Sequence, residues 1–337
     1  MHIFIDESGT FAPPTSDPSI STVGALIVPD RILPGIERKY ARLREELPKH
    51  NDEVKGRLLN EHEINNVVTM LRRHQILFEV AAIDMAVHTT SIVAAHQAAQ
   101  AEALTVHITD RHHHNIRDMV FGLRRQLEAM PGQLYVQSVL TFSLISDVLR
   151  HSTLFYAQRM PRELGNFHWI VDAKGKDHTT AWEKWWTEVV GPMLEWHSLK
   201  DPLGALEGAD YSHFKRYQTK LSDHLKQYVD DPEHDNADNL GMILGESFRF
   251  SSDSEPGLEL VDILVNATRR ALSGSLEAPG WSAIPTLMVH RKHQYISVRG
   301  LAEDVYTTPR PYFPVLRHFT TGGKNMLTRR FLAAGKQ

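Results

Sequence analysis

Cysteine is absent from this chain of 337 residues. Its absence excludes disulfide bonds and metal sites built from thiolates. It also suits a reducing compartment, so we expect a cytoplasmic protein. The sequence has no apolar run of about 18 residues, which predicts no membrane span. The first residues, MHIFIDESG, lack the basic and long apolar segments of a signal peptide, so we expect no secretion signal.

An excess of positive charge is absent too. The chain carries 37 lysines and arginines against 41 acidic residues, for a formal net charge of −4. Proteins that coat nucleic acid non-specifically are usually basic, so any contact with nucleic acid must be local. Hydrophobic residues make up 42% of the chain and charged residues 23%, close to the averages of globular proteins. We therefore expect a folded chain with a buried core.

The apolar pattern predicts an α/β fold. Short apolar runs predict strands at residues 2–5, 21–28, 76–83 and 167–171. Amphipathic patterns predict helices at residues 34–47, 60–73 and 257–272. A long helical pattern between residues 90 and 158 separates the third strand from the fourth. After Gly274 we expect an irregular tail, which carries the basic pair Arg329-Arg330.

Two of the predicted strands end in acids. The first apolar run stops at Asp6 and Glu7, and the fourth stops at Asp172. A carboxylate at a strand end can bind metal while the strand holds it in place. Adjacent strand residues point to opposite faces, so Asp6 and Glu7 share one site only if the strand has ended. The alternative is that both segments are exposed turns, since Asp-Glu-Ser-Gly is typical of turns.

A third candidate is Asp262, which lies inside the apolar helical segment GLELVDILVNATRRAL. An aspartate among leucines and valines is unfavourable in a helix and costly to bury. Glu259 and Asn266 lie three and four residues away, so they share its helix face. A divalent cation would compensate this acidic face. The alternative is a buried salt bridge from Asp262 to Arg269 or Arg270.

Four segments together resemble the domain-of-unknown-function family 3800. They are FIDESG at the start, GALIV in the second strand, EVKG at Glu53 to Gly56, and SEPGLELVDIL near the end. The resemblance spans about residues 1–272. Two positions depart from the family pattern, Glu259 where the family has glutamine and Val261 where it has alanine. Glu259 adds negative charge beside the acid that matches.

The resemblance implies a ribonuclease-H-like fold, which is a mixed sheet flanked by helices. Residues 1–272 would form that domain with a large helical insertion at about 90–165, and residues 273–337 a C-terminal extension packed on it. Such folds place their metal ligands at the end of the first strand, at the end of the fourth strand and in the last helix. Those positions match Asp6, Asp172 and Asp262, and Glu53 or Glu7 would supply a fourth ligand.

Charge and ligand chemistry predict the metal. Three or four converging carboxylates repel one another unless cations lie among them, and oxygen ligands favour Mg²⁺ or Mn²⁺. By the resemblance, the protein is a metal-dependent phosphodiesterase, a nuclease that cleaves RNA or DNA with two metal ions. The side chains expected to contact the nucleic acid are Ser8, Lys55, Lys174, Arg329 and Arg330.

Two alternatives stay open at this point. One is a catalytically silent module that binds nucleic acid or protein, as a regulatory partner in a toxin or phage-defence system. A protein partner or a homo-oligomer is compatible with either function. The other is a restriction-endonuclease-like nuclease, in which Asp172 and Lys174 form a strand-end D-x-K motif and the lysine assists the attacking water. That alternative leaves the DESG segment and the late helix unexplained.

Overall fold

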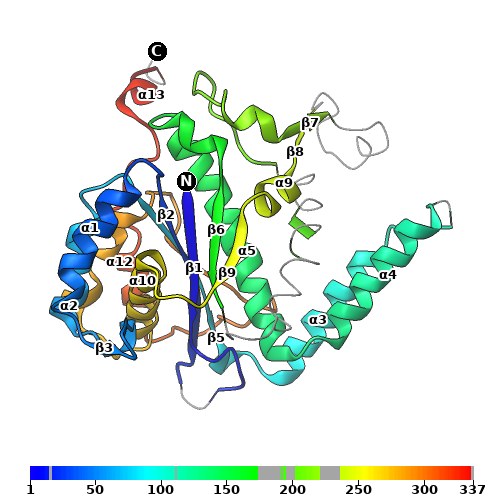
Figure 1. The fold of residues 1–337 in the computed structure, drawn as a ribbon. Coiled ribbons are helices and arrows are strands. Elements are labelled where there is room, and N and C mark those ends of the chain that lie inside the picture. The colour runs from blue at the N-terminus through cyan, green and yellow to red at the C-terminus, as the bar shows by residue number, and fades with distance from the viewer. Residues whose placement is uncertain are drawn as a thin grey trace.

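The structure is a computed structural model that describes residues 1–14, 17–110, 112–173, 190, 193–194, 202–220 and 236–334. Within these residues the fold is α/β, and its centre is a mixed sheet of six strands in the order β10-β5-β2-β1-β6-β9 (Figure 1). The strands are β1 (His2–Ser8), β2 (Ile20–Val28), β5 (Leu77–Asp84), β6 (His168–Asp172), β9 (Phe248–Ser251) and β10 (Ile296–Val298). β2 runs antiparallel to both β1 and β5, whereas β6 runs parallel to β1 and β9. The first strand of the chain is therefore central in the sheet.

Four of these strands lie where the apolar runs predict them, but β1 is longer than expected. It continues through Ser8, because its pairing with β2 extends to Ser8 opposite Thr22. Side chains alternate along a strand, so Asp6 and Ser8 point to one face of the sheet and Glu7 to the other. The expectation that the strand ends before Asp6 is therefore wrong.

Helices cover both faces of the sheet (Figure 1). Ile3 and Ile5 pack on one face in the core that contains α5 (Gly132–Ala157). Phe4 packs on the other face in the core that contains α10 (Pro256–Leu272). This second core also holds α1 (Leu33–Arg44), α2 (Glu61–Leu71) and α12 (Phe313–His318). A strand covered on both faces is apolar throughout, which explains the unbroken first run of the sequence.

The predicted helices form, with ends shifted by up to three residues. α2 begins after Asn60, whose side-chain oxygen accepts a hydrogen bond from the Glu63 backbone N–H at 3.0 Å. Glu63 in turn accepts from the Asn60 N–H at 2.8 Å, so the two residues form a capping box. α10 begins at Pro256, which has no N–H to leave unpaired in the first turn.

The helical segment after β5 divides into three helices. α3 (Thr90–Thr105) and α4 (His114–Ala129) form a hairpin that projects away from the sheet (Figure 1). α5 then returns along the sheet and is buried against β2 and β5. Among the described residues, no helix is long and apolar enough to cross a membrane.

The tail after Gly274 is more regular than the sequence indicates. β10 pairs parallel with β5 and forms one edge of the sheet, and Tyr312, Leu316 and Phe319 are buried in the core around α10. A strand of three residues and helices of six or fewer give no readable period in a sequence, so the pattern could not predict them.

Shorter elements connect the layers. They are, with η denoting a 3₁₀ helix, β3 (Lys49–His50), β4 (Glu53–Val54), η1 (Gly56–Leu58), η2 (Met85–Val87), η3 (Pro161–Gly165), η5 (Phe214–Tyr217), β7 (Gln218–Lys220), β8 (Asn236–Asp238), α9 (Leu240–Gly245), α11 (Ala278–Trp281), η6 (Ile284–Leu287) and α13 (Arg329–Ala334). β3 and β4 form a small hairpin that leads directly into η1.

Two glycines allow α10 to lie unusually close to its neighbours. A Cβ atom at Gly257 would lie 2.3 Å from the Phe4 ring, so β1 and the start of α10 touch through a bare backbone. A Cβ at Gly56 would lie 2.8 Å from the backbone oxygen of Asp262. The close approach of α10 to β1 and to η1 therefore depends on both glycines.

We predict that Gly257→Ala destabilises the fold by about 1–3 kcal/mol, because the new methyl group overlaps the buried Phe4 ring. Gly35→Ala is the matched control, since Gly35 lies in α1 and a methyl group added there would meet no neighbouring atom within 4 Å. That control should be neutral or stabilising by up to about 1 kcal/mol. Urea denaturation of both variants measures the difference, and equal stabilities would contradict the close packing of α10.

Candidate functional site

Asp6 and Asp172 lie side by side on neighbouring strands. β1 and β6 run parallel, and their last paired residues are Ile5 and Val171. Asp6 and Asp172 each follow one residue later. Phe4 and Ile170, two residues earlier on each strand, both pack in the core that contains α10. By the alternation of side chains, the two aspartates therefore point to the α10 face of the sheet.

Asp262 reaches the same place from α10. Its Oδ2 accepts a hydrogen bond from the Gly56 backbone N–H at 2.8 Å. Its negative charge raises the pKa of both Asp6 and Asp172, which places the three carboxylates within electrostatic reach of one another. Three acids that are far apart in the sequence thus meet where the ends of two central strands face one helix.

The EVKG segment borders these acids. Glu53 is the first residue of β4 in the β3–β4 hairpin, and its carboxylate forms an ion pair with the Lys55 ammonium. The charges of both residues act on Asp172 and Asp262, Glu53 raising their pKa and Lys55 lowering it. Gly56 then packs against the backbone of α10, which fixes the segment beside Asp262. The sequence-predicted acid Glu53 is therefore a neighbour of the site. Glu7 points to the opposite face of the sheet and does not share the site as expected, although its charge raises the pKa of Asp6 and Asp172.

We call Asp6, Glu53, Asp172 and Asp262 the acidic cluster. Burial raises the pKa of Asp6 well above its ordinary value, and the charges of Glu7, Asp262 and Asp172 raise it further. Burial and the charge of Glu7 raise the pKa of Asp172 to about 7. Burial also raises the pKa of Asp262, although the Gly56 N–H and Lys55 counteract this. Without a cation, the protein holds these acids together at an electrostatic cost.

The carboxylate oxygens of the described acids do not converge tightly on one point. In the described part of the chain, no three acids of the cluster bring one oxygen each within 4.8 Å of one another. A pair of ions about 4 Å apart needs a wider set, because each ion also binds oxygens on its outer side. For Mg²⁺ those oxygens lie at about 2 Å, so the ligands of an ion pair spread over about 8 Å. A pair of ions would therefore draw its ligands from a wider area than a single ion does.

A polar group beside the cluster was not predicted as a unit. The Ser8 hydroxyl oxygen accepts hydrogen bonds from Asn266 Nδ2 at 3.1 Å and from Arg269 Nε at 2.8 Å. Asn266 is buried, and among the described residues its Oδ1 has no hydrogen-bond partner. The sequence does carry a signal for this group, because Asp262, Asn266 and Arg269 follow one another at spacings of four and three on α10.

Glu259 is part of the scaffold and does not join the acidic cluster. Its carboxylate accepts hydrogen bonds from Tyr40 at 2.8 Å and from Arg44 Nε at 2.9 Å, as well as from the Val54 N–H at 3.1 Å. Burial alone would raise its pKa, but these hydrogen bonds and one from Ser254 hold the pKa below its ordinary value. The extra negative charge expected at Glu259 is thus neutralised by Arg44 of α1, with support from the Val54 N–H of β4.

The salt-bridge alternative for Asp262 is not seen. Arg269 donates to Ser8, and Arg270 donates to the Leu59 carbonyl at 2.7 Å. In the described residues, neither arginine forms an ion pair with Asp262. Of the acids at positions 259 and 262, the fold neutralises the first with an arginine and leaves the second facing other acids.

Two of the predicted substrate contacts, Arg329 and Arg330, do not lie beside the acids. Lys174 lies outside the described residues. Arg329 and Arg330 are exposed at the start of α13, which lies at the end of the molecule where β1 begins (Figure 1). Asp6 lies toward the other end of β1. Ser8 and Lys55, in contrast, contact members or neighbours of the acidic cluster.

Comparisons of the chain with protein-family models, with curated proteins and with solved structures give no match. The resemblance described above therefore rests on its four motifs. In the structure these motifs lie together: FIDESG and GALIV form the paired strands β1 and β2, while EVKG and SEPGLELVDIL meet at Gly56 and Asp262.

We predict that, without metal, the Asp172 carboxyl lowers the stability of the fold as pH rises from about 4 to 7. Asp172 has a folded pKa of about 7 against an ordinary value of 3.8. Between these values the folded state keeps a proton that the unfolded state releases, so this contribution to stability is present at low pH and is lost as pH rises through 7. Urea denaturation in chelator, at several pH values, measures the trend.

Asp172→Asn removes this titration, so the difference in unfolding free energy between wild type and variant should change in favour of the variant as pH rises. Asp253→Asn is the control, because Asp253 is exposed at the loop before α10 and outside the acidic cluster. Its difference from wild type should not depend on pH. A pH-independent difference for Asp172→Asn would contradict the crowding of acids.

Proposed function

We propose that this protein is a divalent-metal-dependent phosphodiesterase, a nuclease that acts on RNA or DNA through a ribonuclease-H-like domain. One observation carries the proposal. Acids from the first strand, from the end of the fourth strand of the large sheet and from α10 converge on one face of the sheet. These are the three positions that the family resemblance implies for metal ligands.

The fold supports the same proposal. The sheet is mixed, its first strand lies at the centre, and helices cover both faces. The helical segment of α3, α4 and α5 is inserted between the third and fourth strands of the sheet, β5 and β6. Because folds host many functions, the acids carry more of the functional argument than the architecture does.

The residues present fit Mg²⁺ or Mn²⁺. All candidate ligands are oxygens, which these hard cations prefer, and no thiolate exists in the chain. Burial first and neighbouring carboxylates second raise the pKa values of Asp6, Asp172 and Asp262, and bound cations would stabilise the ionised acids. Asn266 Oδ1, which lacks a partner in the described residues, is a further oxygen near the site.

The three aspartates then share one role. Two bound ions would activate a water molecule and stabilise the oxygen that leaves the phosphodiester. The charges of both Asp172 and Asp262 act on Asp6, and these three carboxylates would hold the ions. Rigid strands and the packed helix α10 keep the three carboxylates oriented.

Arg269 is our candidate for the phosphate contact. Its Nε is held by Ser8, and in the described part of the chain its terminal amino groups have no hydrogen-bond partner. A guanidinium fixed at one end can present its other donors to a phosphate in a defined direction. Lys55 adds a second positive charge near Asp262. Local cations of this kind fit a chain whose net charge is negative.

The test is cleavage of labelled single- and double-stranded RNA and DNA with Mg²⁺, Mn²⁺ or chelator. We predict metal-dependent cleavage of at least one of these substrates. Asp6→Asn and Asp262→Asn should each slow single-turnover cleavage at least about 100-fold, equal to about 2.7 kcal/mol of barrier, whereas Asp253→Asn should not. Chelation should abolish cleavage in the wild-type protein.

Lys174→Ala separates the two nuclease hypotheses in the same assay. If the site is built on Asp6 and Asp262, this variant keeps its rate within about tenfold. A restriction-endonuclease-like site would show the opposite pattern, with Lys174 essential and Asp262 dispensable. Tight Mn²⁺ binding without cleavage of any nucleic acid would overturn the nuclease assignment. Absence of both binding and cleavage would favour a catalytically silent module.

A further inference from the structure

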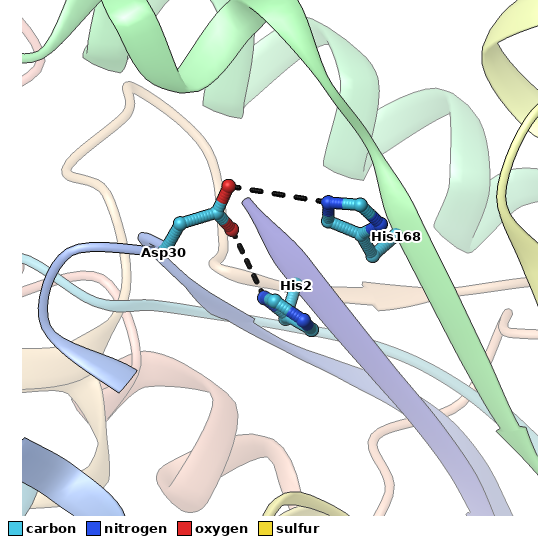
Figure 2. Close-up of side chains that lie close together, drawn as sticks. All are labelled: His2, Asp30 and His168. Carbon is cyan, nitrogen blue, oxygen red and sulfur yellow. Dashed lines mark hydrogen bonds and ion pairs between the residues drawn. The ribbon is translucent and has the colours of Figure 1, made fainter. Parts of the chain in front are cut away.

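A second group of ligand-type side chains lies at the opposite end of β1 from the acidic cluster. His2 begins β1, His168 begins β6, and Asp30 follows the end of β2 (Figure 2). The three residues thus come from three neighbouring strands of the sheet. Along a strand, four residues separate His2 from Asp6, or about 13 Å at 3.3 Å per residue, so this group is separate from the cluster.

The three side chains point toward one another. His2 Nδ1 lies 2.9 Å from Asp30 Oδ1, and His168 Nε2 lies 4.0 Å from Asp30 Oδ2. One ligand atom from each residue lies within 4.8 Å of the other two. Around a tetrahedral zinc ion with bonds of about 2.0–2.1 Å, ligand atoms are about 3.3 Å apart. Small side-chain rotations would therefore bring all three ligands onto one ion.

The protonation states also suit a metal. His2 and His168 stack with their ring centroids 4.6 Å apart, so positive charge on both rings is unfavourable. Burial and the charge of His2 lower the pKa of His168, which favours the neutral imidazole that binds metal. Burial opposes ionisation of Asp30, but its hydrogen bond with His2 and the N-terminal ammonium lower its pKa to about 2.

A supporting hydrogen bond orients one of the rings. His168 Nδ1 lies 2.8 Å from the Ser247 hydroxyl, which leaves Nε2 directed to Asp30. Histidines that bind metal usually have their second nitrogen held in this way. The side chains are about one third exposed, at 29% for His2, 41% for Asp30 and 34% for His168, so an ion can enter from solvent.

The Met1 ammonium is the competitor for this position. It lies 2.9 Å from Asp30 Oδ1 and donates to the Asn166 carbonyl at 2.7 Å. Asp30 Oδ2 faces His168 and is left for an ion. For an ion to bind at Oδ2, the His2 ring would have to turn from Asp30 Oδ1 toward the ion. The ammonium could keep its contact with Asn166.

The geometry points to a zinc site formed by His2, Asp30 and His168. Two imidazole nitrogens and one carboxylate oxygen are ligands that Zn²⁺ accepts, with a water molecule as the fourth. The ion would join β2, β1 and β6 at the end where β1 and β6 begin. It would thereby stabilise the pair of strands whose other ends carry Asp6 and Asp172. This inference does not depend on the proposed nuclease activity.

Calorimetric titration with Zn²⁺ tests the site, in buffer with excess Mg²⁺ so that the acidic cluster is occupied. We expect one tight Zn²⁺ per chain, with the affinity reduced at least tenfold in His2→Gln and in His168→Gln. The control is His113→Gln/His114→Gln, because these two rings also lie close, at 4.2 Å, but in the α3–α4 hairpin. This control should bind Zn²⁺ as the wild type does.

Two further measurements test the coordination of the bound ion and the folding of the variants. Co²⁺ in place of Zn²⁺ should give the visible absorption of a four-coordinate ion in the wild type and lose it in both variants. Circular dichroism and melting in chelator should match wild type for His2→Gln and His168→Gln, which shows that they fold. The inference is overturned if wild type binds no stoichiometric Zn²⁺, or if binding survives both variants or is lost in the control.

Discussion

The close contact between α10 and the central strands is the constraint on which the site depends. Gly257 lets the start of the helix touch the Phe4 ring on β1, and Gly56 lets the EVKG segment touch the helix backbone beside Asp262. Any larger residue at either position would move the helix outward. Because Asp6 is fixed to β1 and Asp262 to α10, the distance between their carboxylates follows from this packing. The electrostatics of the acidic cluster thus depend on the close packing that Gly56 and Gly257 allow.

The two acids on α10 show how the fold treats charge. Glu259 is buried among Arg44, Tyr40 and the Val54 N–H, so its negative charge is matched by partners from α1 and β4. Asp262, one turn later, accepts a hydrogen bond from the Gly56 N–H, and although the charges of Lys55 and Arg57 act on it, burial keeps its pKa raised. Burying an unpaired charge is costly. The fold neutralises Glu259 but not Asp262, so the repulsion acting on Asp262 lowers the stability of the protein. A bound cation removes that cost, which is the physical basis of our proposal.

Much of this arrangement could be predicted from the sequence, but not all of it. The unbroken apolar runs identified the four main strands, and the oddity of an aspartate among leucines and valines identified Asp262. The length of β1 could not be predicted, because it depends on pairing with β2 and not on local pattern. The same holds for β10, a three-residue strand that forms only against β5. His2, Asp30 and His168 were not singled out, since no spacing in the sequence shows that three strand ends meet.

Direct counting of bound Mn²⁺ tests the central claim, that the acidic cluster is a metal centre. Electron paramagnetic resonance of free Mn²⁺ during a titration gives the number of ions bound per chain without reference to any substrate. The account predicts two ions per wild-type chain, an affinity at least tenfold weaker in Asp6→Asn, and no change in Asp253→Asn. Wild-type protein that binds no Mn²⁺ near neutral pH, or that binds it equally well after Asp6→Asn, would contradict the account.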